Sequence, residues 1–127
     1  MKRRESILKI LKTWDDLAEA AYKLDVKEGD KYTRVGFMPG LGNGGIATWL
    51  INANQGTCWY TEDGETVTPT VNSEVNKEGF KWFRGMIDHY GQDTYNEYEA
   101  AFKSGMADPF ASGTMSMLVQ TSAYTSS

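Results

Sequence analysis

The glycine cluster from Gly40 to Gly45 offers the first chemistry that this sequence could perform. Its letters, GLGNGG, satisfy G-x-G-x-x-G, in which glycines let the backbone approach a pyrophosphate at the N-terminus of the following helix. Glu62, Asp63 and Glu65 follow about 20 residues later, where a dinucleotide site places its ribose-binding acid. Pro39 stiffens the turn, however, and the next pattern is a hairpin rather than a second parallel strand. The cluster therefore indicates either a nucleotide-binding loop, or a loop that lines a ligand cleft or turns the chain.

Paired carboxylates are the second candidate, because hydrolysis of a glycoside uses one carboxyl group with a raised pKa beside one with an ordinary pKa. The pairs are Asp15-Asp16, Glu62-Asp63 and Glu97-Glu99. The start of a helix accounts for the first pair, and the tip of a hairpin accounts for the second. We therefore expect solvated surface carboxylates, and a glycosidase is the alternative that these pairs leave open.

The single histidine and the single cysteine limit the remaining chemistry. Asp88-His89 resembles part of a catalytic triad, but nothing identifies a nucleophile, and a cation at the end of a helix offsets the helix dipole. Cys58 lies in a β-prone run, and we expect it to be a small buried thiol. One cysteine excludes an internal disulfide framework and a multi-thiolate zinc site. We predict no catalytic residue, no metal site and no cofactor.

Trp49 is the aromatic residue with the strongest claim to a ligand. Its predicted helix follows the glycine cluster, and Ala47 and Thr48 leave its flank uncrowded. A tryptophan at the mouth of a cleft can stack on the C–H face of a sugar. Packing in the core is the other interpretation of Trp49, and spacing alone does not separate the two.

Helices are the clearest of the elements that must position these residues. Residues 13–24 repeat apolar side chains at three- and four-residue spacing after a predicted N-cap, Thr13. A helix over 46–54 is predicted to close at Gly56, and Thr94 with Glu97 predicts a capping box for a helix ending at Ser104. The long helix from Asn72-Ser73 to about Tyr90 has a predicted buried stripe of Val75, Phe80, Phe83, Ile87 and Tyr90.

Strands are predicted between these helices. Residues 32–38 are β-prone, and the runs 58–60 and 65–71 form a hairpin around Glu62-Asp63-Gly64. Asp108-Pro109 opens a short turn that stops at Gly113, before a last strand over 115–119. Helices that separate strands predict an α/β layered fold.

Composition narrows the class of protein. The 127 residues fit one domain, and 13 Lys and Arg against 17 Asp and Glu give a formal charge of −4. That acidity argues against nucleic acid or an anionic membrane surface as the main partner. No stretch reaches the roughly 18 apolar residues of a membrane span, and the N-terminus lacks the pattern of a signal peptide. Taken alone, these features are typical of a cytosolic protein.

Three stretches, in this order, resemble the family 1 extracellular solute-binding proteins of ABC importers. TWDDLAEAAYKL (13–24) resembles that family's "TWDE…EAAKKL" helix, and TWLINANQG (48–56) resembles the tryptophan and Gly-ended stretch of its maltose-type members. ADPFASGTMSMLV (107–119) is similar to the family's "F-x-x-G-x-x-A-M" motif. The residues between the second and third stretches match the family's usual hairpin and long helix.

The resemblance implies a two-lobed receptor that closes on its solute by a hinge motion. It implies that residues 13–127 are a partial second lobe of a type II periplasmic-binding-protein-like fold, a fragment with helices around a small sheet and a β-hairpin. Residues 1–12 stay unassigned. The implied location is extracellular or periplasmic, free or lipid-anchored, and the implied partners are a hydroxyl-rich small molecule and ABC permease subunits.

The resemblance also implies the ligand contacts. Trp49 would be the sugar-stacking platform, and Gly42 and Asn43 would lie on a loop that approaches the cleft. Many sugar binders of the family place an aromatic residue in a "G-P-W"-like turn after the last strand, but this chain continues with Gln120-Thr121-Ser122-Ala123-Tyr124. The expected polar contacts are therefore Thr121, Ser122 and Tyr124. The small hydroxyl residues are similar to those of glycerol-phosphate-type members, so a receptor for glycerol phosphates or their diesters is the alternative.

Overall fold

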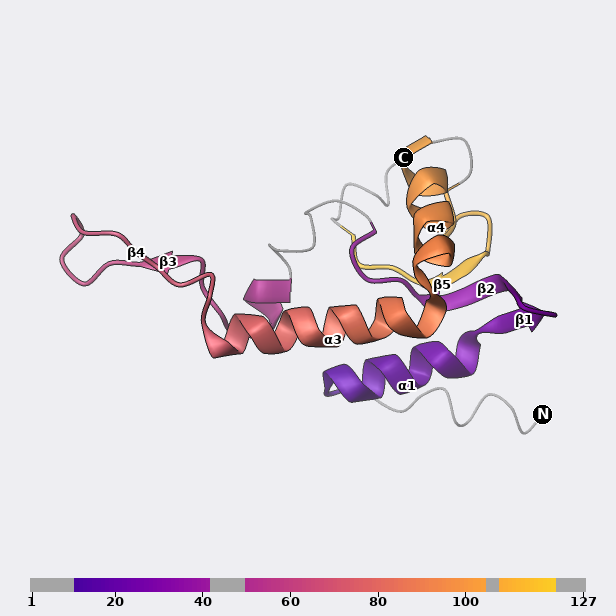
Figure 1. Ribbon diagram of the computed structural model, residues 1–127, viewed down its shortest axis with the longest axis horizontal. Helices are drawn as coiled ribbons and strands as arrows, with labels where there is room; N and C mark the ends of the chain where they lie inside the picture. Colours follow the sequence, from indigo (N-terminus) through magenta and orange to yellow (C-terminus); the bar gives the residue numbers. More distant parts are fainter. Residues whose placement is uncertain (1–10, 42–49, 105–107, 121–127) are drawn as a thin grey trace. The chain divides into compact units, whose positions relative to one another are not determined.

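The computed structural model describes residues 11–41, 50–104 and 108–120, which belong to two compact units (Figure 1). The first unit contains the described residues up to Met38 together with Gln92–Leu118. The second contains the described residues of Pro39–Gly91 together with Val119 and Gln120. Helices and small sheets occur together, which confirms the α/β class.

Helix α1 (Trp14–Leu24) opens the first unit with the N-cap that the sequence predicts. Thr13 Oγ1 accepts a hydrogen bond from the Asp16 amide at 3.1 Å, and Asp16 Oδ2 accepts one from the Thr13 amide at 3.1 Å. This reciprocal capping box satisfies donors that a helix start otherwise leaves without partners. The carboxylates of Asp15 and Asp16 are therefore explained by the start of α1.

The first unit's sheet has the strand order β1-β2-β5. Strands β1 (Val26–Glu28) and β2 (Lys31–Phe37) form an antiparallel hairpin that turns at Gly29, where φ is +63°. Strand β1 is absent from the sequence prediction, because its three exposed residues show no alternation of buried and exposed side chains. Strand β5 (Met115–Met117) pairs with β2 in parallel. The predicted last strand is confirmed, although it ends at Met117 rather than Val119.

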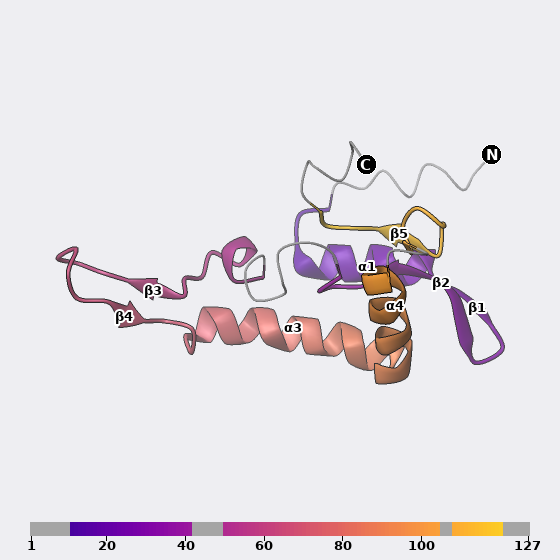
Figure 2. The same ribbon diagram turned by 90° about the horizontal axis from the view of Figure 1, so that it is seen from above.

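Helix α1 approaches β2 most closely at Gly36. A Cβ built on Gly36 would lie 1.9 Å from the carbonyl oxygen of Ala21, so only a glycine fits between the two backbones. The Gly36 amide donates to Asp25 Oδ1 at 2.8 Å, just beyond the end of α1. Ala21, Val35 and Phe37 are buried. The contact at Gly36 therefore sets how closely α1 packs on the sheet. Figures 1 and 2 show α1 lying alongside β2.

Helix α4 (Gln92–Ser104) begins earlier than predicted, so the capping box of Thr94 and Glu97 is wrong. The helix starts directly after Gly91, whose φ of +90° interrupts the helical conformation of the backbone. Glu97 instead places a carboxylate oxygen 3.5 Å from Lys31 Nζ. The buried Tyr98 fixes α4 to the sheet, because its hydroxyl donates to the Thr114 carbonyl at 3.0 Å, next to β5.

The turn before β5 has the predicted geometry. Asp108 Oδ1 accepts hydrogen bonds from the amides of Phe110 at 2.8 Å and Ala111 at 3.1 Å. Gly113 ends the turn with a φ of +78°. An aspartate that captures the following amides is the usual way to start such a turn.

The second unit contains the predicted hairpin and the long helix. Strands β3 (Trp59–Tyr60) and β4 (Thr68–Pro69) pair antiparallel, and helix α3 (Glu74–Tyr90) runs from the Ser73 N-cap to Gly91. Both elements are confirmed, with strands shorter than expected. Figures 1 and 2 show the hairpin extending beyond the N-terminal end of α3.

The buried face of α3 differs in part from the predicted stripe. Ile87 and Tyr90 are buried as expected, but Val75 is 42 % exposed. The residues that the prediction omits from this face are Asn76, Gly79 and Met86. An asparagine and a glycine are invisible to a hydrophobic pattern, so the first half of the buried face was not predictable from apolar spacing.

Gly36→Ala should destabilise the protein by about 3 kcal/mol, because the added methyl group must push a backbone carbonyl away. Urea unfolding followed by circular dichroism measures this. Gly85→Ala is the matched control: Gly85 lies in α3 with nothing within 4 Å of its Cβ position, so that change should stabilise by roughly 0.5–1 kcal/mol. Equal midpoints for Gly36→Ala and the unchanged protein would contradict the close approach of α1 and β2.

Candidate functional site

The six residues predicted to contact ligand lie outside the described residues. They are Gly42, Asn43, Trp49, Thr121, Ser122 and Tyr124. The structure does describe the backbone on both sides of the first segment, at Pro39–Leu41 and Leu50, and the backbone before the second, at Val119–Gln120. All of these flanking residues belong to the second compact unit. Both predicted ligand-binding segments therefore join the chain within one unit.

The approach to the glycine cluster is anchored by buried residues. Pro39 is fully buried, and Leu41 is buried as well. Gly40 between them has a φ of +86°, a backbone conformation that other residues rarely adopt. The first glycine of the cluster is thus required for a turn at this point.

The helix at residues 50–53 is anchored by two buried apolar side chains and by hydrogen bonds at its C-terminal end. Residues 50–53 are helical, and Leu50 and Ile51 are both buried. The Gly56 amide donates to the Ile51 carbonyl at 2.8 Å, and the Gln55 amide donates to the Asn52 carbonyl at 3.1 Å. These two bonds form a Schellman motif, in which the left-handed position usually belongs to glycine. Here Gln55 takes that position, with a φ of 60°, rather than the predicted Gly56.

Gly56 is required instead by a buried side chain. A Cβ on Gly56 would lie 1.9 Å from Asn76 Oδ1, so the Cα–H bond of Gly56 points at that oxygen. Asn76 is only 1 % exposed, and it lies in the first turn of α3. Any side chain at residue 56 would therefore collide with this buried amide oxygen.

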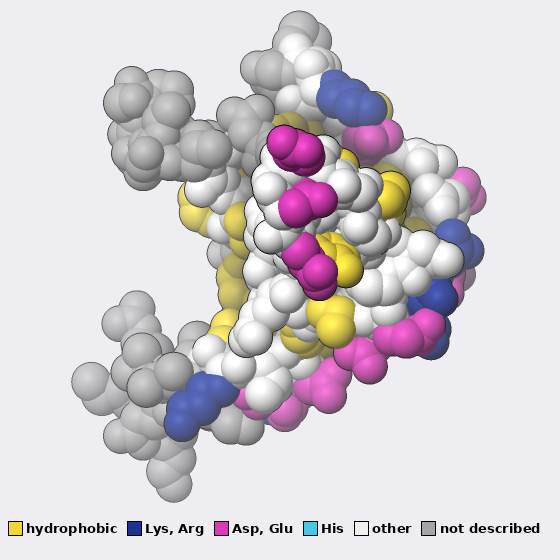
Figure 3. Space-filling view, turned by 90° about the vertical axis from the view of Figure 1, so that its left-hand side faces the viewer, with side chains coloured by type: hydrophobic (Ala, Val, Ile, Leu, Met, Phe, Trp, Pro, Cys, Tyr) yellow, Lys and Arg dark blue, Asp and Glu magenta, His cyan; other side chains and the backbone are white. Residues whose placement is uncertain are grey.

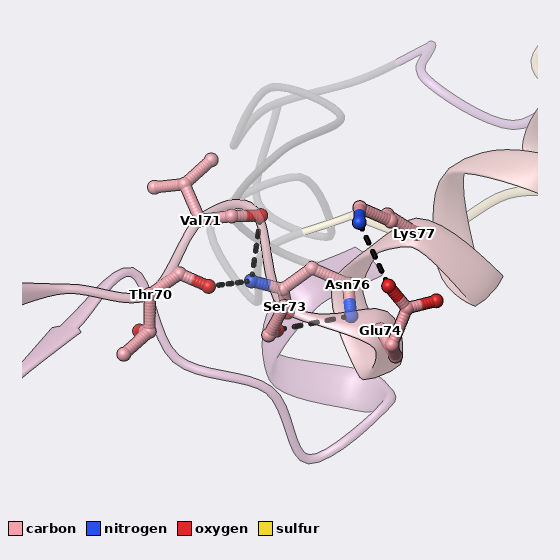
Figure 4. A network of polar contacts seen from close by, with 6 residues as sticks. All are labelled: Thr70, Val71, Ser73, Glu74, Asn76 and Lys77. Atoms are coloured by element: carbon pink, nitrogen blue, oxygen red, sulfur yellow. Dashed lines mark hydrogen bonds and ion pairs between the residues drawn. The ribbon is translucent and has the colours of Figure 1, made fainter.

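The amide nitrogen of Asn76 holds both legs of the hairpin. Asn76 Nδ2 donates to the carbonyl oxygens of Thr57 at 2.9 Å, Thr70 at 3.0 Å and Val71 at 3.2 Å. Figure 4 shows the bonds to Thr70 and Val71 beside the Ser73 cap of α3. If the amide were flipped, Asn76 Oδ1 would lie against three carbonyl oxygens, none of which can donate a hydrogen bond. These contacts therefore fix the orientation of the Asn76 amide. We call Asn76 with Gly56, Thr57, Thr70 and Val71 the Asn76 joint.

The Asn76 joint connects three segments at one buried point. It joins the end of the helix at 50–53, the two legs of the hairpin and the start of α3. Asn76 Oδ1 is buried and accepts no hydrogen bond within the described residues. A second side chain supports the connection, since Asn54 Nδ2 donates to the Val75 carbonyl at 2.7 Å. The joint therefore fixes the helix end that follows the predicted ligand loop.

The carboxylate of Asp63 organises the tip of the hairpin. Asp63 Oδ1 accepts hydrogen bonds from the amides of Glu65 at 2.9 Å and Thr66 at 2.7 Å, and the hydroxyls of Thr61 and Thr66 donate to the same carboxylate. The hydrogen bonds from Thr66 and Glu65, with those of the two hydroxyls, hold the pKa of Asp63 well below its ordinary value. A general acid needs a raised pKa, so the Asp63 carboxylate is unsuited to that role in a glycosidase pair.

The other polar candidates are engaged in ion pairs or exposed. Glu99 lies 3.0 Å from Lys103, and Asp88 lies 2.9 Å from Arg84, one turn earlier on α3. His89 lies in the last turn of α3, where the sequence places it. The prediction that Cys58 is buried is wrong: the thiol is exposed, because the hairpin that carries it projects from α3.

The described residues contain no cluster of three or more His, Cys, Asp or Glu arranged to hold a metal ion. None of their helices combines the length and the hydrophobicity needed to cross a membrane.

Gly56→Ala should cost about 2–3 kcal/mol of stability, because the new methyl group takes the place of Asn76 Oδ1. Asn76→Ala should cost a similar amount, since three hydrogen bonds from Asn76 Nδ2 are lost, although the Thr57 and Thr70 carbonyls each keep one other donor. The two changes should not add: in the Asn76→Ala background, Gly56→Ala should cost less than about 1 kcal/mol. A double-mutant cycle by urea unfolding tests this, and additive values would contradict the contact.

The hairpin tip should loosen in acid. Because the pKa of Asp63 is lowered on folding, its stabilising contribution is complete above the unfolded pKa of about 3.9 and is lost as the pH falls below it. NMR hydrogen exchange of the Glu65 and Thr66 amides should therefore speed up, relative to the intrinsic rate, as the pH drops below that value. Asp63→Asn should show the same loosening at neutral pH. If the two amides are equally protected in that variant, the carboxylate does not hold the tip.

Comparison with known proteins identifies the family. A family model described as bacterial extracellular solute-binding protein matches residues 4–126. Comparisons with curated proteins and with solved structures gave no match. The matched range includes most of the N-terminal stretch left unassigned above and both segments that carry the predicted ligand contacts. The match spans nearly the whole sequence, so this chain belongs to the bacterial extracellular solute-binding protein family.

Proposed function

We propose that this chain is a partial second lobe of a carbohydrate receptor that delivers its solute to the permease of an ABC importer. The observation that carries the proposal is the family match over residues 4–126, because proteins of this family bind extracellular solutes. The receptor acts outside the cytoplasmic membrane, free or lipid-anchored, and catalyses no reaction.

The ligand contacts combine an apolar platform with hydroxyl groups. The indole of Trp49 stacks on a sugar ring, and the loop with Gly42 and Asn43 approaches the ligand through its backbone. The hydroxyls of Thr121, Ser122 and Tyr124 exchange hydrogen bonds with those of the sugar. Support comes from the flanks, because the loop follows buried Pro39 and Leu41 and precedes buried Leu50 and Ile51. A site on anchored segments loses less entropy when it binds.

The charge of the chain favours a neutral sugar over a phosphate. The stretch 35–76, which contains Trp49 and the glycine cluster, has no Lys, Arg or His, and neither has the stretch 104–127. Phosphate is usually held by Arg or Lys, whose charge-assisted hydrogen bonds are about twice as strong as neutral ones. The small hydroxyl residues Thr121 and Ser122 are the feature that keeps a glycerol-phosphate receptor as the second candidate.

Titration of the full chain with maltose, maltotriose and glycerol 3-phosphate, followed by ligand-observed NMR, tests the proposal. We expect weak, millimolar binding of the sugars, because one lobe supplies one wall of a two-lobed site, and no turnover. Trp49→Ala should weaken that binding by about tenfold or more, which corresponds to about 1.4 kcal/mol. Its far-UV circular dichroism and melting temperature should not change.

Trp59→Ala is the matched control, since it removes an exposed tryptophan from the hairpin and should leave sugar binding unchanged. A marked drop in melting temperature for Trp49→Ala would assign that residue to the core instead. Binding of glycerol 3-phosphate alone would favour the second candidate, and cleavage of the sugar would overturn the receptor function.

A further inference from the structure

The net charge of the chain is confined to one segment. Four of the 17 acidic residues and none of the 13 basic residues fall within 35–76, so the other 13 acidic residues balance the 13 basic ones. Three of the four, Glu62, Asp63 and Glu65, lie between β3 and β4 of the hairpin. The hydrogen bonds at the tip keep the Asp63 carboxylate ionised. We call residues 57–71 the acidic hairpin.

One face of the acidic hairpin is apolar and exposed. Trp59 is directly opposite Pro69 in the strand register, so both side chains lie on the same face. Trp59 is 59 % exposed and Val67, near the paired strands, is 60 % exposed. Large apolar side chains that gather on a projecting element mark an interaction site. In Figure 3 the hairpin points toward the viewer, and acidic side chains lie at the centre of the view beside hydrophobic ones.

The acidic hairpin is held in shape at both ends, although its strands are short. A two-stranded hairpin alone is marginally stable in water. At the base, the Asn76 joint binds both legs, and the hydroxyls of Thr57 and Thr70 are 2.7 Å apart. At the tip, Asp63 gathers two amides and two hydroxyls. A preformed surface of this kind loses little conformational entropy when a partner binds.

We propose that the acidic hairpin is a docking site for a protein partner whose surface presents an apolar groove to Trp59, with Lys and Arg around it. The partner's basic charge is required by the three carboxylates, which no cation of the segment neutralises. The groove is required by Trp59, since tryptophan is among the residues that most often dominate the energy of an interface.

Charge and chemistry argue against the other occupants. A second copy of the chain would bring the same acidic hairpin or a charge-balanced surface, and two acidic hairpins repel each other. An anionic membrane carries the wrong sign of charge. A sugar is uncharged, so it would leave the three carboxylates of the hairpin without a complementary charge.

Fluorescence anisotropy with three dye-labelled synthetic peptides tests the docking site on the full chain. In the first peptide Lys and Arg alternate with Leu and Val; in the second, Ser replaces Leu and Val; in the third, Glu replaces Lys and Arg. The first should bind about tenfold more tightly than the second, and the third should not bind. Binding of the first should weaken as the ionic strength rises from about 0.05 to 0.5 M.

Variants separate the apolar contribution from the charge. Trp59→Ala should reduce binding of the first peptide by about tenfold, down to the level of the Ser peptide. Glu62→Gln with Glu65→Gln should reduce it as well and flatten its salt dependence. The controls are Phe110→Ala, another exposed aromatic residue, and Glu28→Gln with Asp30→Asn, which removes two exposed charges from the β1–β2 hairpin. These controls should bind like the unchanged protein.

Other outcomes would overturn the proposal. They include equal binding of the Ser peptide, equal losses in the control variants, and a dimer in sedimentation that Trp59→Ala abolishes. Trp59-dependent binding to phosphatidylcholine vesicles or to maltoheptaose would assign the hairpin to a membrane or a sugar polymer. Because Trp59 and the two glutamates are exposed, circular dichroism and the urea midpoint should be the same in every variant.

Discussion

The buried amide of Asn76 is the interaction on which the second unit depends. One nitrogen serves three carbonyl oxygens from both legs of the hairpin, and one oxygen occupies the space that a side chain at Gly56 would need. A buried amide without partners would cost a few kcal/mol, so the segments around it must keep their positions. The joint thereby determines where the hairpin projects from α3 and where the helix at 50–53 ends.

Local signals in the sequence were sufficient for most elements of the fold. Thr13, Ser73 and Asp108 act at the starts of their elements as predicted, because a side chain and its neighbouring amides need only a few adjacent residues. Contacts between distant segments were not predictable in this way. Gly36 lies within a predicted strand and Gly56 at a predicted helix end, but each is needed because another segment passes close to it. The misplaced start of α4 has a local cause instead, since α4 begins directly after the positive φ of Gly91 and not at the Thr94 pattern.

The candidate site, like the fold, has a part that the sequence predicts and a part that only the structure shows. The family is evident from three stretches spread along the chain, and the match over residues 4–126 confirms it. The ligand contacts at Trp49 and around Thr121 rest on that kinship, and they stay predictions because they lie outside the described residues. The structure adds the anchors on either side of the loop, and the role of Asn76 had no signal in the sequence, where it is one polar residue in a helix.

A single compositional feature, the lack of cations in 35–76, has two consequences for function. Around the predicted ligand loop, it leaves backbone groups, hydroxyls and an indole to make the contacts, which suits a neutral polyol better than an anion. On the hairpin, it leaves three carboxylates without a neutralising cation in their own segment. Their negative potential attracts a basic protein surface. An anionic solute would be repelled by the same field that attracts a basic protein. Within this segment, a neutral ligand and a basic partner are therefore the combination that electrostatics favours.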